Sequence, residues 1–99
     1  MQLSGDLLHE LEAVVRRLGW ELRYERGDFH SGVVRWRRNR LVVLNRDASL
    51  IERGRALRSA LLVSSLDEIY LTPALRRWLN QEATENPLPR GRPGEHDEF

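Results

Sequence analysis

Arginine is the residue type whose number and spacing most clearly suggest a chemistry. All 16 basic residues are arginines, and lysine is absent. The segment from Arg16 to Arg58 holds twelve of them against five acidic residues, so its net charge is +7, whereas residues 1–15 and 59–99 each carry −3. The planar guanidinium group donates paired hydrogen bonds to phosphate and carboxylate oxygens. The central segment therefore suggests anion binding, although a GC-rich genome is the simpler explanation of an all-arginine composition.

Catalytic and metal-binding side chains are present but form no pattern. The histidines His9, His30 and His96 are far apart, and none has the His-x-x-x-His spacing of a zinc-binding helix. The absence of cysteine excludes thiol catalysis, disulfides and cysteine zinc sites. No serine lies in a Gly-x-Ser-x-Gly turn, and there is no glycine-rich phosphate loop. We therefore expect a protein that is not an enzyme and that holds no metal and no cofactor.

Length and composition indicate a single small domain. The chain has 99 residues, of which 40% are hydrophobic and 31% are charged. No apolar run approaches the roughly 20 residues that span a bilayer, so we expect a cytoplasmic protein without membrane association. Residues 1–83 are predicted to form the domain. Residues 84–99, rich in proline, glycine and charge, are predicted to be a disordered tail.

Helix signals occur at three places along the chain. Leucine and valine form a helical stripe over Leu7–Leu18, which Ser4 or Asp6 caps and Gly19 ends. Ser49 and Glu52 form a capping box at the head of a second helix, and Thr72 followed by a proline starts a third. The glycine at position 54 predicts that the second helix crosses the sheet closely.

Apolar and polar residues alternate in three strand-like segments, which are Trp20–Glu25, Gly32–Arg37 and Leu41–Leu44. A three-residue loop at Gly27–Phe29 places Trp20 opposite Trp36, Leu22 opposite Val34 and Glu21 opposite Arg35. A two-residue loop at Arg38–Asn39 places Trp36 opposite Leu41 and Val34 opposite Val43. These loops predict a three-stranded antiparallel meander.

The expected fold class is α+β, with the order α-β-β-β-α-(β)-α and the helices packed on one face of the meander. The bracketed strand is a short extended segment at Asp67–Leu71. The residues expected in the core are Leu8, Leu11, Val15, Trp20, Leu22, Val34, Trp36, Leu41, Val43, Leu57, Leu61 and Leu75.

The opposite face of this meander is the candidate interaction site. It mixes aliphatic and basic side chains, a composition typical of protein interfaces. The candidate residues are Val33, Arg35, Arg37, Arg38, Arg40, Val42, Leu44 and Arg46. Of these, Arg38 lies at the predicted turn and Arg46 just after the third strand. A domain of this size gains stability when such a face is buried against a partner. The leading hypothesis is therefore a non-catalytic protein-interaction module that self-associates as a homodimer through this face.

Nucleic-acid binding is the alternative, because arginines on one sheet face can neutralise a phosphate backbone. Against it, Glu21 and Glu25 can neutralise the arginines as cross-strand pairs. The aromatic residues Trp20, Tyr24 and Trp36 are assigned to the core side, so the face lacks exposed rings for stacking bases.

The order of signals resembles a group of small uncharacterised bacterial proteins. The likeness is carried by Gly19–Glu25, Ser31–Gly32, Leu41–Arg46 and Ile69–Arg76, and it implies no activity. The helix, meander and following helix also resemble the core of minimal zinc peptidases. That family carries His-Glu-x-x-His on its second helix, a motif missing from Arg53–Val63. This resemblance implies a third alternative, a degenerate, metal-free peptidase-like domain.

Overall fold

The computed structural model describes residues 3–86, except for the side chain of Trp36. The elements follow in the order α1 (Gly5–Arg17), β1 (Glu21–Glu25), β2 (Gly32–Trp36), β3 (Asn39–Asn45), α2 (Leu50–Leu62) and α3 (Pro73–Glu85). The α+β class is confirmed. Helix α3 runs two residues past the predicted domain boundary at 83, so Thr84 and Glu85 are helical. The rest of the predicted tail lies outside the described residues.

The helices begin where the sequence predicts, because each N-cap side chain accepts a hydrogen bond from a backbone N–H of the first turn. Ser4 Oγ accepts from Leu7 N at 3.1 Å, Ser49 Oγ from Glu52 N at 3.1 Å and Thr72 Oγ1 from Leu75 N at 3.3 Å. Gly19, just after α1, has φ of +93°, which favours glycine. The extended segment predicted at Asp67–Leu71 is wrong, because these residues form an irregular connection.

The three strands form a mixed sheet in the order β1-β3-β2, so the predicted antiparallel meander is wrong. Strand β1 is parallel to β3, and only β2 and β3 form an antiparallel hairpin. The physical reason lies in the four consecutive apolar residues Leu41–Leu44. Such a run suits a central strand that has neighbours on both sides, whereas the charged residues that alternate along β1 suit an edge.

The parallel pairing also reverses which residues of β2 and β3 face the helices. Leu22 lies opposite Val42 and Tyr24 opposite Leu44, so the even-numbered residues of β3 join the apolar face of β1. Val42 and Leu44 are fully buried. Of the residues expected in the core, Val34, Leu41 and Val43 are therefore wrongly assigned. The hairpin loop is Arg37–Arg38 rather than Arg38–Asn39, because Trp36 pairs with Asn39.

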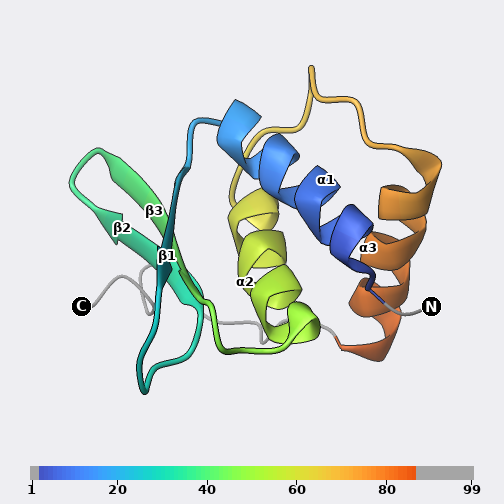
Figure 1. The fold of residues 1–99 in the computed structure, drawn as a ribbon. Helices are drawn as coiled ribbons and strands as arrows, with labels where there is room; N and C mark the ends of the chain where they lie inside the picture. Colours follow the sequence, from blue (N-terminus) through green and yellow to red (C-terminus); the bar gives the residue numbers. More distant parts are fainter. Residues whose placement is uncertain (1–2, 87–99) are drawn as a thin grey trace.

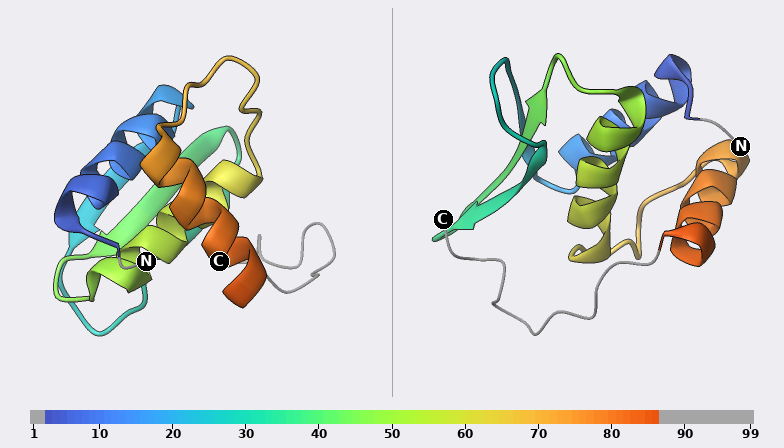
Figure 2. Two further views of the ribbon diagram at one scale, coloured as in Figure 1. Left: turned by 90° about the vertical axis from the view of Figure 1, so that its right-hand side faces the viewer. Right: turned by 90° about the horizontal axis from the view of Figure 1, so that it is seen from below.

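The molecule has three layers, which Figure 1 and Figure 2 show from three directions. Helices α1 and α2 cover one face of the sheet, as predicted, and α3 packs on the far side of this helix pair. The expected core residues that are buried are Leu8, Leu11, Val15, Trp20, Leu57, Leu61 and Leu75, with Leu22 half-buried beside them. No helix of the described part covers the other face of the sheet.

Gly54 was predicted to let α2 cross the sheet closely. That prediction is wrong, because the atoms nearest to this position belong to Leu3 and Trp78. A Cβ atom at this position would meet Leu3 Cδ2 and would lie 3.3 Å from Cη2 of Trp78. Trp78 belongs to α3 and is buried. The glycine therefore makes room for the side chains of Trp78 and Leu3 against α2, on the side away from the sheet.

Candidate functional site

The face predicted as the interaction site does not exist as one surface. Val42 and Leu44 are fully buried under α1 and α2, and Val33 is half-buried against the same core. Their assignment to an outer face is wrong, because β1 pairs with β3 and turns these residues inward. Arg46 follows β3 at the end away from the hairpin turn, so it is separated from the other four arginines.

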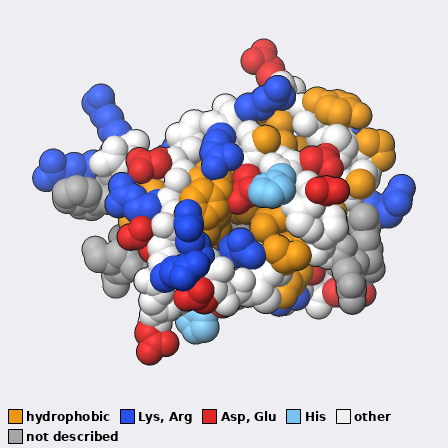
Figure 3. All heavy atoms as spheres, viewed as in Figure 1, with side chains coloured by type: hydrophobic (Ala, Val, Ile, Leu, Met, Phe, Trp, Pro, Cys, Tyr) orange, Lys and Arg blue, Asp and Glu red, His pale blue; other side chains and the backbone are white. Residues whose placement is uncertain are grey.

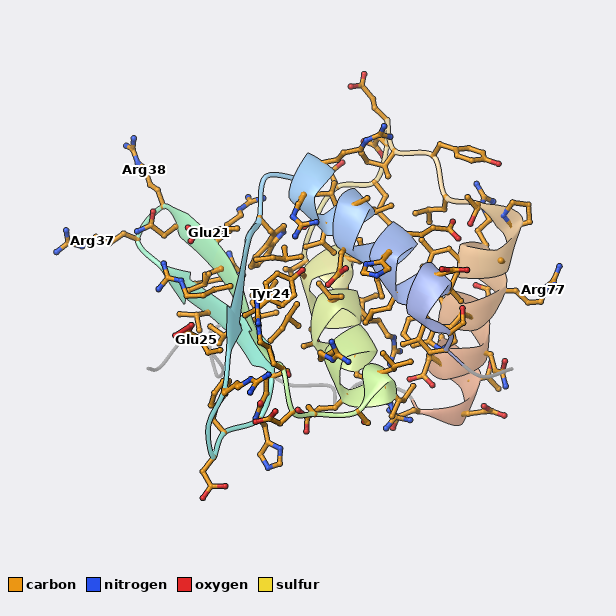
Figure 4. The ribbon with its side chains drawn as sticks, viewed as in Figure 1. Glu21, Tyr24, Glu25, Arg37, Arg38 and Arg77 are labelled. Atoms are coloured by element: carbon orange, nitrogen blue, oxygen red, sulfur yellow. The ribbon has the colours of Figure 1, made fainter. Side chains whose placement is uncertain are left out.

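Those four arginines stay together at the end of the β2–β3 hairpin. Arg35, Arg37, Arg38 and Arg40 all have exposed side chains, and we call them the arginine hairpin. Figure 4 shows Arg37 and Arg38 extending from the turn away from the body of the molecule. Arg37 has φ of 58°, a left-handed conformation that is uncommon for a residue with a side chain.

Within the arginine hairpin, two like charges lie on neighbouring strands. Arg35 and Arg40 are directly opposite each other in the β2–β3 register, an arrangement that destabilises a sheet. The guanidinium carbon of Arg40 also lies 5.8 Å from the ring centroid of Trp20. Trp20 is fixed by a 2.9 Å hydrogen bond from its Nε1 to Ser64 Oγ. The ring contact therefore anchors Arg40 on the helix side of the sheet without neutralising its charge.

The acidic residues expected to neutralise the arginines are engaged or placed elsewhere. Glu21 Oε2 lies 3.1 Å from Nη2 of Arg23 on its own strand. The predicted pair of Glu21 with Arg35 is wrong, because β3 lies between their strands. Within residues 3–86, none of Arg35, Arg38 and Arg40 forms an ion pair with a carboxylate. The arginine hairpin therefore presents cationic charge to solvent.

A second polar group lies where α1 meets β1, and its central residue is the buried Glu12. The Tyr24 hydroxyl donates to Glu12 Oε2 at 2.6 Å, and His9 Nδ1 lies 2.9 Å from Glu12 Oε1. Arg16 Nη2 donates to the Tyr24 hydroxyl oxygen at 3.0 Å. Glu12 was not among the sequence candidates, although it follows Leu8 by one helical turn and therefore borders the buried stripe.

Burial, followed by the hydrogen bond to Glu12, raises the pKa of Tyr24 to about 12. The phenol therefore stays protonated at neutral pH and acts as a donor to the carboxylate. In Figure 4, Tyr24 points from β1 toward the helices, whereas Glu21 and Glu25 lie on the other side of the strand. The network thus fixes the guanidinium group of Arg16 at the surface between α1 and β1.

A cluster of His30, Ser31 and Glu52 joins the β1–β2 loop to α2. Glu52 accepts from Ser31 N and Ser31 Oγ, each at 3.2 Å, and His30 Nδ1 lies 3.2 Å from its other oxygen. The hydrogen bond with His30, followed by those from Ser31, lowers the pKa of Glu52. Ser31 Oγ also accepts a 2.8 Å hydrogen bond from Asn45 N at the end of β3. The role of the cluster is to tie the loop to the helix.

The outer face of the sheet carries charged and aliphatic residues side by side. By register, Glu21, Arg23 and Glu25 share this face with Leu41 and Val43. Val34 lies opposite Leu41 and completes a half-exposed aliphatic row. This mixture of acidic, basic and aliphatic residues differs from the arginine-rich face that the sequence suggested.

Residues 3–86 contain no group of three or more histidine, aspartate or glutamate side chains arranged to hold a metal ion. None of the helices in this part of the chain is long and apolar enough to cross a bilayer. Comparisons with protein-family models, curated proteins and solved structures give no match. The proposals below therefore rest on the geometry of this chain.

Proposed function

We propose that the protein is a non-catalytic module that binds the phosphate backbone of nucleic acid through the arginine hairpin. The observation that carries this proposal is the exposure of four arginines within six residues, three of them without any carboxylate partner in the described structure. Backbone neutralisation by such side chains supplies most of the affinity of non-specific nucleic-acid binding.

The arrangement of the hairpin supports this proposal beyond its charge. Arg35 and Arg40 are placed opposite each other despite their repulsion, and Arg37 adopts a conformation that costs conformational energy. Neither feature favours folding of the free protein. A bound polyanion would relieve the repulsion and would compensate these costs.

The salt dependence of binding provides the test. Each phosphate neutralised contributes about −0.9 to the slope of log K against log salt on duplex DNA and about −0.7 on single strands. With four arginines engaged, we expect a slope of roughly −3 to −4 on duplex DNA, measured by fluorescence anisotropy. The double variant Arg38→Gln and Arg40→Gln should flatten that slope by roughly 2.

The matched control is the double variant Arg76→Gln and Arg77→Gln on α3. It removes the same charge from an exposed region, and Figure 4 shows Arg77 on the opposite side of the molecule from the hairpin. Equal weakening by both double variants would show that only net charge matters. Failure of the parent protein to bind either a labelled RNA or a labelled duplex at ~50 mM salt would contradict the proposal.

Self-association is a second candidate function, and the outer face of the sheet favours it. Leu41, Val43 and Val34 are half-exposed on a face that no described helix covers. Strand β1 lies at the sheet edge and alternates Glu21, Arg23 and Glu25 on that face. Two copies of β1 paired antiparallel, with Glu21 opposite Arg23 of the other copy, would join opposite charges on both sides of the dimer axis.

For this second proposal, sedimentation equilibrium at micromolar concentration is expected to give a dimer. Arg23→Glu would place like charges opposite each other on both sides of the dimer axis and should shift the equilibrium to monomer, while the circular dichroism spectrum stays unchanged. Leu62→Arg serves as the control, because Leu62 is 57% exposed at the end of α2, a helix that lies on the other face of the sheet. A parent protein that is strictly monomeric would contradict self-association.

A further inference from the structure

A hollow of about 580 Å³ lies between α1, β1 and the start of α2. Its polar lining consists of His9, Glu12, Arg16, Tyr24, Arg46 and Arg53, and we call it the Arg53 hollow. Figure 3 shows this face, where arginine side chains surround an area in which a histidine, acidic and apolar side chains meet. None of these residues belongs to the arginine hairpin.

Arg53 contributes a guanidinium group with an unpaired donor atom to this hollow. Its Nε atom is buried, and no described residue accepts a hydrogen bond from it. Buried donors almost always have a partner, because losing the hydrogen bonds to water without replacing them is unfavourable. The natural partner for a guanidinium group is an anionic oxygen, and Arg53 lines the hollow.

The other two arginines are held in place but keep free donors. Arg16 uses one Nη atom on the Tyr24 hydroxyl, which leaves its remaining N–H groups available. The guanidinium carbon of Arg46 lies 5.9 Å from the centroid of the Tyr24 ring, and this contact occupies no N–H donor. Tyr24 therefore holds two guanidinium groups, Arg16 through its hydroxyl and Arg46 through its ring.

Glu12, in contrast, has its oxygens engaged inside the network. One accepts from Tyr24, and the other lies within hydrogen-bond distance of His9. With three arginines and one glutamate, the Arg53 hollow carries a net charge of +2 when His9 is neutral. A phosphate monoester carries a charge of about −1.5 to −2 at pH 7 and has three strong acceptor oxygens.

The first residue of α2 adds to the same effect, because Leu50 lies three residues before Arg53 and also lines the hollow. Helix N-termini carry partial positive charge and favour bound anions. Leu8, which also lines the hollow, offers apolar surface to the organic part of a ligand.

We propose that the Arg53 hollow binds the phosphate group of a small phosphate monoester, whose oxygens accept hydrogen bonds from the guanidinium groups of Arg53, Arg16 and Arg46. This site is separate from the arginine hairpin and does not depend on the nucleic-acid function.

Isothermal titration calorimetry with phenyl phosphate and with inorganic phosphate, at constant ionic strength set by chloride, tests the proposal. We expect saturable one-to-one binding of phenyl phosphate by the parent protein. Arg53→Gln should weaken it by about tenfold or more, the loss expected for a hydrogen bond between charged groups. Arg53→Lys keeps the charge but loses the planar fork, so it should bind more weakly than the parent and more tightly than Arg53→Gln.

Arg38→Gln in the arginine hairpin is the matched control, and it should leave phenyl phosphate affinity unchanged. If Arg53→Gln fails to fold, Arg46→Gln should show the same weakening. Unchanged affinity in both Arg53→Gln and Arg46→Gln, or the absence of saturable binding by the parent protein, would overturn the proposal. Loss of phenyl phosphate binding on Arg38→Gln would also overturn it, because the phosphate would then sit on the hairpin.

Discussion

Replacing Leu44 with alanine is expected to lower the free energy of unfolding by about 2–5 kcal/mol, the usual cost of a leucine-sized cavity in a core. Leu44 is fully buried in the helix-covered face of β3. Its neighbour Val43 is half-exposed on the opposite face. Val43→Ala should therefore cost less than about 1 kcal/mol. Urea denaturation of the two variants at neutral pH measures both values.

This pair of variants distinguishes the observed sheet from the antiparallel meander. In the meander, Val43 lies in the core and Leu44 faces solvent, so the order of the two losses would be reversed. A larger loss for Val43→Ala than for Leu44→Ala would contradict the parallel pairing of β1 with β3. Equal slopes of free energy against urea concentration would show that both variants unfold from the same compact state.

Replacing Glu82 with alanine is expected to cost about 3–5 kcal/mol, because it leaves a buried cation without its counter-charge. Arg58 and Glu82 are both buried where α2 meets α3. Glu82 Oε1 lies 3.9 Å from Nη1 of Arg58 and accepts a 3.0 Å hydrogen bond from Nε of Arg55. Arg58 also donates to the Asn86 carbonyl oxygen at 2.9 Å, a neutral acceptor that cannot balance its charge.

Two further variants separate burial from charge. Glu85→Ala removes a carboxylate from the same helix, but Glu85 is exposed, so its loss should stay within about 0.5 kcal/mol. The double variant Arg58→Met and Glu82→Leu removes both buried charges and should recover most of the stability that Glu82→Ala loses. A double variant no more stable than Glu82→Ala would indicate that the cost arises from packing. Urea titrations and thermal unfolding of the parent protein and each variant measure these losses.

The two proposed binding sites use arginine in different settings. In the arginine hairpin, Arg35, Arg38 and Arg40 are exposed and lie within six residues of sequence, which suits contacts with a long polyanion. In the Arg53 hollow, arginines from α1, from the segment after β3 and from α2 line one hollow, which suits a compact anionic ligand. The salt-slope and calorimetric experiments address the two sites with separate variants.

The sequence alone was sufficient for the positions of the helices. Caps at Ser4, Ser49 and Thr72, and the glycine after α1, act within one helical turn. Because these signals act over three or four residues, they do not depend on where the rest of the chain lies. The clustering of arginines between positions 35 and 40 was visible for the same reason, since a hairpin turn keeps residues that are close in sequence close in space.

Sheet topology required the tertiary structure. The alternation in β1 correctly predicted that Leu22 and Tyr24 face the core. Along Leu41–Leu44 every residue is apolar, so the sequence of this strand does not show which residues face the core. Which alternate residues of that strand are buried depends on the strand beside it. That strand is β1, which pairs with β3 although β2 lies between them in the sequence. A shift of one residue in the face assignment exchanges core and surface for the whole strand.

The same dependence on distant partners explains the site residues that were missed. Arg53, Arg46 and Arg16 come from three separate elements, and only the packing of α1 against β1 and α2 brings them around one hollow. Glu12 was hidden because a carboxylate beside a buried stripe is normally solvated, and its burial depends on the hydroxyl of Tyr24, twelve residues away. Local signals therefore determined the elements of this protein. Long-range pairing decided which side chains were buried and which were brought together, because those outcomes depend on contacts between segments that are remote in sequence.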